Sequence, residues 1–141
     1  GPNLDLLGQR EPAIYGHQTL ADVEALCRAE LDGRDVGLIF RQTNAEHEMV
    51  GWLHEARIGA YGVILNPAAF SYAGYPILDA LKMGDCPIIE VHISNIHRRD
   101  EPWRAQSIMT RSVTAIFSGA GIDGYALAVR PLLQIDRRKA A

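Results

Sequence analysis

Four short apolar runs, separated by segments with helical patterns, constrain the fold of this chain more than any other feature. The runs cover residues 36–40, 62–66, 87–93 and 114–118, and aliphatic or aromatic side chains dominate each. Strands buried on both faces of a parallel sheet read as continuous apolar runs, and crossover helices connect them. The alternation therefore predicts an α/β fold with helices on both faces of a parallel sheet.

The first two helices have recognisable beginnings. Thr19 can cap a helix that continues to Leu31 and ends at Asp32-Gly33, with Asp22 in its first turn. Asn44 can cap a second helix, whose apolar side follows the three-to-four spacing at Met49, Val50, Leu53 and Ile58. These signals predict one helix before the first apolar run and a second helix between the first and second runs.

Two later helices are predicted from their end signals. A short helix is expected from Pro76 to Met83, with Gly84 as its stop. A final helix is expected from about Ile122 to Ile135, interrupted or kinked at Pro131, because a proline removes one helical hydrogen bond.

Composition limits the setting to a single globular domain, residues 1–141. A net charge of −3 gives no basic field for nucleic acid, and no apolar stretch approaches the length of a membrane span. Cys27 and Cys86 lie far apart, with no metal-binding spacing around them. We therefore expect a cytoplasmic protein without a metal site or a disulfide.

The N-terminal segment GPNLDLLGQREPAIYG is a shaped loop, because its glycines and prolines disfavour both strand and helix. Arg10 and Tyr15 lie at its far end. Functional loops in parallel α/β folds follow the carboxyl ends of strands, so we expect a first strand before residue 1 rather than a sheet without its central strand.

Glu90 and His92 alternate along the third apolar run, so both side chains lie on one face of the strand. A carboxylate and an imidazole on a buried strand have to be paired. The pair is either a satisfied core contact or a general acid, in which the carboxylate holds an imidazole that protonates a leaving group.

The N-terminal loop, the segment ILNPAAF at 64–70 and the segment IEVHISN at 89–95 together resemble the type II 3-dehydroquinate dehydratases. The resemblance covers the whole chain. It implies a flavodoxin-like fold, a dodecamer built as a tetramer of trimers, and elimination of water from 3-dehydroquinate to give 3-dehydroshikimate. It also implies a small anionic substrate, no cofactor or metal, no covalent intermediate, and a place in aromatic biosynthesis through the shikimate pathway or in quinate breakdown.

The resemblance assigns the catalytic roles. It implies that Tyr15 is the base and Arg10 its electrostatic partner on a lid formed by the loop of residues 1–16. Tyrosine ordinarily titrates at a pKa of about 10, and a nearby cation favours its phenolate form. Asn3 would hold the water that stabilises the enolate, His92 would be the acid, and Glu90 would orient it. In isolation, Arg10 and Tyr15 read as an exposed arginine and a packed tyrosine.

The resemblance also implies a set of substrate ligands. Asn66, the Ile93 backbone and Ser94 would bind the carboxylate, and Arg104 the ring hydroxyls, although residues 101–103 add one position to the usual spacing. Asp79 would reach a neighbouring subunit's site. His97 and Arg99 also match recurrent family positions, and we interpret them as structural polar residues.

One segment departs from the family pattern. Tyr72 stands where the family usually has histidine, and Ala73-Gly74 replaces Thr-Ser, which suggests that the smaller residues make room for the phenol. Because these positions would touch ring hydroxyls, the reaction class is better supported than the substrate. Three hypotheses follow: the dehydratase, the same elimination on a related cyclic hydroxy-ketoacid, and a non-catalytic binding relative.

Overall fold

A three-stranded parallel sheet forms the centre of the computed structural model, which describes residues 1–140 and the side chains of residues 1–135. The strands are β1 (Val63–Leu65), β2 (Ile88–His92) and β3 (Ala115–Ser118), arranged in that order. Both neighbouring pairs are parallel. Three of the four predicted strands, and their parallel arrangement, are therefore confirmed.

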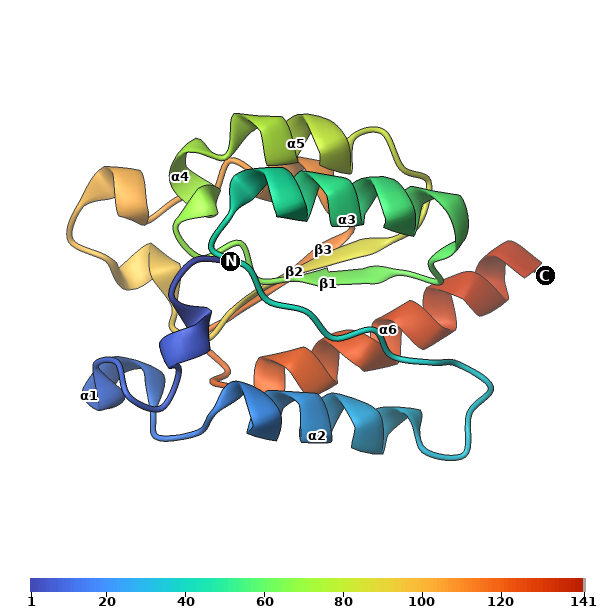
Figure 1. The fold of residues 1–141 in the computed structure, drawn as a ribbon, viewed down its shortest axis with the longest axis horizontal. Coiled ribbons are helices and arrows are strands. Elements are labelled where there is room, and N and C mark those ends of the chain that lie inside the picture. Colours follow the sequence, from blue (N-terminus) through green and yellow to red (C-terminus); the bar gives the residue numbers. More distant parts are fainter. Residues whose placement is uncertain (141) are drawn as a thin grey trace.

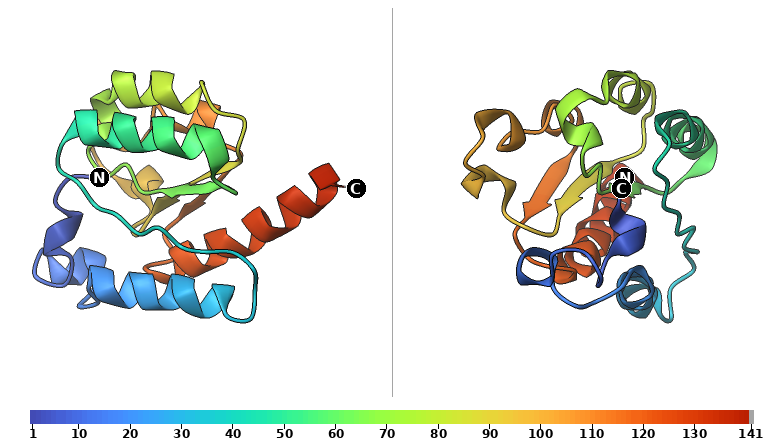
Figure 2. Two further views of the ribbon diagram at one scale, coloured as in Figure 1. Left: turned by 45° about the vertical axis from the view of Figure 1, so that its right-hand side comes forward. Right: turned by 60° about the vertical axis from the view of Figure 1, so that its left-hand side comes forward.

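Two helical layers enclose this sheet (Figure 1). Helices α2 (Leu20–Leu31) and α6 (Asp123–Ala140) cover one face, and α3 (Glu46–Gly59) and α5 (Tyr75–Leu81) cover the other. Turning the molecule keeps the three layers distinct (Figure 2). The predicted α/β class, with helices on both faces, is confirmed.

Each face of the sheet has its own core, and β2 contributes to both. Ile89 and Val91 are completely buried and pack with Val23 of α2 and Val129 of α6. Ile88 packs instead with the core of α3 and α5. Since side chains alternate along a strand, Glu90 and His92 lie on the same side as Ile88.

Short helical turns gather where the strands end. After β1 comes α4 (Phe70–Ala73), and the long connection from β2 to β3 contains η2 (Ile96–Arg98), η3 (Pro102–Arg104) and η4 (Thr110–Ser112). The N-terminal segment adds η1 (Leu4–Leu6) and α1 (Pro12–Tyr15). These segments carry most of the candidate site.

Helix beginnings differ in how well their caps were predicted. Thr19 caps α2 as expected, in a capping box with Asp22. Asn44 does not cap α3, whose first residue is Glu46. Its Oδ1 instead accepts the Asn3 amide at 2.8 Å, while Thr43 Oγ1 accepts the Ala45 amide at 2.9 Å. Asn44 thus anchors the N-terminal loop rather than the helix.

The predicted strand at 36–40 is wrong. Its side chains do alternate, with Val36, Leu38 and Phe40 packed on the core and Ile39 78% exposed. Within residues 1–140, however, this segment has no hydrogen-bonded neighbour strand, because β1 pairs only with β2. An alternating apolar pattern predicts an extended chain, but a strand also needs a ladder partner.

Three details of the predicted helices also need correction. Ile58 is 82% exposed rather than on the packed side of α3. Helix α5 ends at Leu81, before Gly84. Pro131 does not interrupt α6, which continues to Ala140. Leu132 and Leu133 are buried just after the proline, so packing outweighs the lost hydrogen bond.

Candidate active site

A buried Glu–His pair lies at the carboxyl end of β2. Glu90 Oε1 lies 2.7 Å from His92 Nε2, and the side chains are 0% and 5% exposed. Thr110 Oγ1 donates to the other carboxylate oxygen at 2.7 Å. This geometry confirms the prediction that both side chains share one face, and it leaves Nδ1 as the imidazole nitrogen available to a ligand.

Hydrogen bonds keep Glu90 ionised despite its burial. Burial raises the pKa of a carboxyl group, but bonds from His92, Ser107 and Thr110 outweigh that effect, so the pKa of Glu90 lies below its usual value. An ionised Glu90 can only accept, so His92 Nε2 donates to it. The contact therefore holds the imidazole in one orientation.

Tyr15 ends the single-turn helix α1, between Glu11 at φ 38° and Gly16 at φ 78°. The Arg10 guanidinium lies 5.2 Å from the centre of the Tyr15 ring, and Arg10 Nε donates to Glu11 Oε2 at 3.2 Å. The two predicted lid residues are thus adjacent. The cation faces the ring rather than the phenol oxygen.

Arg99 is the cation that reaches the phenol oxygen. Its Nη2 lies 3.4 Å from Tyr15 Oη and donates to Ser94 Oγ at 2.9 Å. A single guanidinium therefore joins the lid to the segment that follows β2. Sequence analysis interpreted Arg99 as a structural polar residue, because it follows an apolar strand in a loop rich in charge. His97 differs, since its Nδ1 meets the Ala105 carbonyl at 2.9 Å.

Asn66 and Asn3 belong to two further segments of the candidate site, the loop after β1 and the N-terminal loop. Asn66 follows β1, donates from Nδ2 to Tyr125 Oη at 2.7 Å, and accepts the Ala68 amide at 3.0 Å. Asn3 adopts a left-handed φ of 65° and lines a small crevice with Arg10 and Tyr15. Tyr125 is a contact that the sequence analysis missed, because α6 carries it 59 residues away from Asn66.

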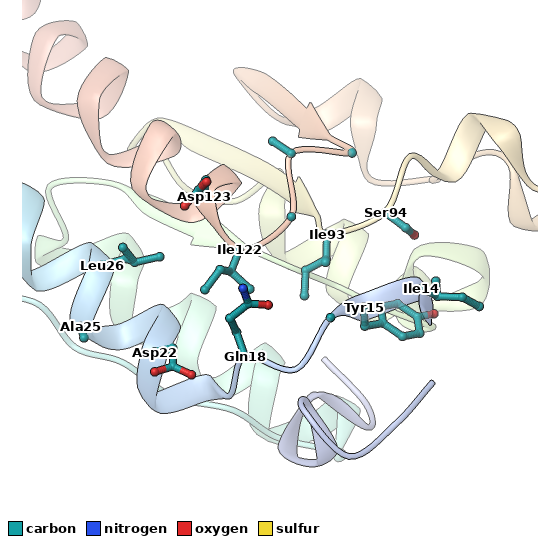
Figure 3. Close-up of a pocket in the computed structure, with 14 residues that line it drawn as sticks. Ile14, Tyr15, Gln18, Asp22, Ala25, Leu26, Ile93, Ser94, Ile122 and Asp123 are labelled. Atoms are coloured by element: carbon teal, nitrogen blue, oxygen red, sulfur yellow. The ribbon is translucent and has the colours of Figure 1, made fainter. Parts of the chain in front are cut away.

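A pocket of about 810 Å³ opens beside Tyr15 (Figure 3). Tyr15 and Ser94 line one end, and Asp22 of α2 and Asp123 of α6 line the other. Ile93 lines its wall between these ends. The structure therefore brings Tyr15, Ile93 and Ser94 together at one opening.

The residues expected near ring hydroxyls form a second group. Tyr72 contacts Trp103 edge-on, with ring centroids 5.1 Å apart. Interaction with the Tyr72 hydroxyl is the main cause of a raised pKa at Arg104, and Tyr15 contributes to it. Arg104 thus interacts with both tyrosines, and more strongly with Tyr72. Asp79 is exposed on α5 and forms no ion pair with a described residue.

The expected room for Tyr72 does not come from Gly74. A Cβ at Gly74 would lie 2.6 Å from the Phe70 carbonyl oxygen and 3.1 Å from Met109 Cε. The glycine therefore permits the tight junction of α4 and α5, and Tyr72 packs against Trp103 instead.

Other kinds of site have little support in the described part of the chain. Among residues 1–135, whose side chains the structure describes, no group of three or more His, Cys, Asp or Glu side chains is placed to bind a metal. Among the same residues, no helix has the length and apolar character needed to cross a membrane. Neither Cys27 nor Cys86 forms a disulfide with a described residue. Burial raises the pKa of Cys27 to about 11, which makes it a poor nucleophile.

Comparison with known proteins identifies relatives of this chain along most of its length. The family model for class II dehydroquinases matches residues 1–133. The chain is 48% identical over 140 residues to 3-dehydroquinate dehydratase 2 of Agrobacterium fabrum, covering 99% of this chain and 95% of that protein. It is 51% identical to the 3-dehydroquinate dehydratase of Streptomyces avermitilis, covering 92% of this chain and 81% of that one.

A solved structure extends the agreement to three dimensions. The type II dehydroquinase of Propionibacterium acnes superposes with a TM-score of 0.86 at 43% identity, covering 95% of this chain and 92% of that chain. Sequence and fold therefore agree over nearly the whole length, and this chain belongs to the class II dehydroquinase family.

Proposed function

We propose that this chain dehydrates 3-dehydroquinate to 3-dehydroshikimate through an enolate. The observation that carries the proposal is the contact between Arg99 and both Tyr15 and Ser94, which joins a lid phenol to the loop after the His92 strand. A base and an acid held on two separate elements suit the removal of a proton and a hydroxyl from neighbouring carbons.

Tyr15 acts as the base. Its phenolate removes the proton on the carbon next to the substrate ketone, and the Arg99 guanidinium stabilises the phenolate through the 3.4 Å contact with Oη. Arg10, 5.2 Å from the ring centre, adds a second positive charge on the lid. This arrangement extends the expected Arg10–Tyr15 pair by one further arginine.

His92 acts as the acid. The electron pair left by the proton forms the enolate, whose oxygen is stabilised by a water held by Asn3. Collapse of the enolate expels the hydroxyl, which leaves as water with a proton from His92. Glu90, ionised and bonded to Nε2, orients the imidazole for this transfer.

The substrate carboxylate binds between two strand ends. Asn66 contributes its amide, held by Tyr125 and Ala68, and the segment after β2 contributes the Ile93 backbone and the Ser94 hydroxyl. Tyr72 and Arg104 contact the ring hydroxyls, together with Asp79 from a neighbouring subunit of a dodecamer. The lid closes over the bound substrate and excludes water.

The single domain, residues 1–141, would work in the cytoplasm, in aromatic biosynthesis or in quinate breakdown. Two cysteines that form no disulfide with a described residue suit a reducing compartment. Neither pathway is favoured by a particular residue.

A related cyclic hydroxy-ketoacid is the second candidate substrate, and Tyr72 in the hydroxyl-binding group is the observation that favours it.

The direct experiment mixes purified protein with 3-dehydroquinate and follows the absorbance of the conjugated product. Turnover supports the proposal. Absence of turnover would contradict it, and turnover of the second substrate alone would replace it. A failure to turn over either compound while still binding one of them would favour a non-catalytic relative.

A further inference from the structure

Two segments far apart in the sequence meet in space. Tyr72 lies on α4, and Trp103 lies in η3. Their rings are almost perpendicular, at 82°, with centroids 5.1 Å apart. The two side chains thus form one packed unit.

Trp103 supports its neighbours from an exposed position. It is 64% exposed, so its ring serves little purpose in the hydrophobic core. One part of that ring meets Tyr72, and the Arg104 guanidinium carbon lies 5.9 Å from its centroid. The tryptophan therefore contacts both side chains expected to meet the ring hydroxyls of a substrate.

The guanidinium of Arg104 determines whether the Tyr72 hydroxyl donates or accepts a hydrogen bond. A guanidinium has only donors, so in its interaction with Arg104 the Tyr72 oxygen accepts. The phenol proton remains available for an outside acceptor. A neutral histidine could offer that acceptor either a donor or a lone pair, whereas Tyr72 in this setting offers a donor.

We propose that Trp103 is a positioning residue that holds Tyr72 as a hydrogen-bond donor toward a ring oxygen of the substrate, and so sets substrate affinity at this end of the site. The inference rests on the proposed function and deepens it. Trp103 acts through the Tyr72 hydroxyl, and it has no contact with the reacting carbon.

A double-mutant cycle tests this coupling. Tyr72→Phe keeps the ring contact and removes the hydroxyl, so KM should rise about 2- to 10-fold, the effect of one hydrogen bond, with little change in kcat. Trp103→Leu should raise KM to a similar extent. Trp103→Phe, which keeps an aromatic edge, should restore most of the affinity.

The double variant decides between coupling and independent effects. If Trp103 acts through the hydroxyl, Trp103→Leu should add almost nothing in the Tyr72→Phe background. KM effects that multiply, an unchanged KM in Trp103→Leu, or a fall in kcat larger than the rise in KM would overturn the inference. Melting temperatures of all variants identify any loss of folding, which an exposed side chain should not cause.

A matched control removes another hydroxyl from the same region. Tyr75 begins α5 and is 60% exposed, and Tyr75→Phe should leave KM unchanged. A rise equal to that of Tyr72→Phe would overturn the assignment to Tyr72. Turnover by the wild type distinguishes a failure of the proposed function from a failure of the inference about Trp103. Without turnover of 3-dehydroquinate the proposed function fails and the inference with it, whereas turnover with multiplying effects removes the inference alone.

Discussion

The proposed acid and the proposed base of the candidate site are built in opposite ways. Glu90 and His92 lie on a central strand, with exposures of 0% and 5% and two bonds of 2.7 Å around the carboxylate. Tyr15 lies on a one-turn helix beside Ile14, which is 52% exposed. The acid is fixed by the core of the protein, whereas the base is fixed by a few contacts of a surface loop.

This difference separates two requirements of the reaction. A buried pair keeps its geometry because any rotation would leave a charge without a partner. A loop with few buried contacts can open at small cost, which lets substrate enter and water be excluded afterwards. Arg99 is the point where these halves meet, since it contacts Tyr15 and also Ser94 next to β2.

The largest expected effect comes from removing the base. Tyr15→Phe should lower kcat by about 10²–10⁴, the usual contribution of a positioned acid–base group, and leave KM and stability close to wild type. Steady-state kinetics and thermal unfolding measure both quantities. Full activity in this variant would remove Tyr15 from the mechanism.

The contact that joins the two halves should have the next largest effect. Arg99→Ala removes a charged hydrogen bond to the phenol oxygen, so kcat/KM should fall about 10- to 100-fold. Arg99→Lys keeps the charge and should recover part of the loss. An unchanged kcat/KM in Arg99→Ala would remove the arginine from the mechanism.

Local patterns in the sequence predicted the fixed half of the site well. Period two along β2 was enough to pair Glu90 with His92, because strand geometry determines which side chains share a face. Thr19 was similarly recognisable as a cap, since its partner Asp22 is three residues away. The family resemblance narrowed the α/β class to the fold of the type II dehydroquinases, and the comparison with a solved structure supports that fold.

The contacts between distant segments could not be predicted in this way. Arg99 and Tyr15 are separated by 84 residues, and no periodicity relates them. Asn44 has the residue type and position of a helix cap, yet its amide binds the N-terminal loop, and either use satisfies its hydrogen bonds. The segment at 36–40 has a strand pattern without a ladder partner. In each case the missing information is which part of the chain lies next to the residue.

Changes at the buried Glu90–His92 pair should affect the free energy of unfolding more than changes in the N-terminal loop. Glu90→Gln replaces charged hydrogen bonds with neutral ones, so the free energy of unfolding near neutral pH should fall by about 1–3 kcal/mol. The folded-state pKa of Glu90 lies below its usual value, so its contribution is complete above the unfolded pKa of about 4.3 and is lost as pH falls through the folded pKa.

Urea unfolding at neutral and acid pH measures this contribution. The difference between wild type and Glu90→Gln should begin to shrink below the unfolded pKa and be smallest below the folded pKa, where both chains carry a neutral side chain. An equal difference at both pH values would contradict the ionised state of Glu90. Tyr15→Phe, in the N-terminal loop, is the matched control, and its free energy of unfolding should follow that of wild type at both pH values.

The smallest effect is expected where the fixed half supports Asn66. Tyr125→Phe removes the acceptor of the Asn66 amide at 2.7 Å and should lower the free energy of unfolding by about 0.5–1.5 kcal/mol near neutral pH. Burial raises the pKa of Tyr125 to about 12, despite an opposing bond from Asn66. A raised folded pKa means that stability is complete below the unfolded value of about 10 and is lost as pH rises toward the folded one. Wild type should therefore lose its advantage over Tyr125→Phe at alkaline pH, whereas the same titration of Cys27 occurs in both chains and cancels. A difference that stays constant through this range would show that the hydroxyl at Tyr125 does not titrate from a buried position.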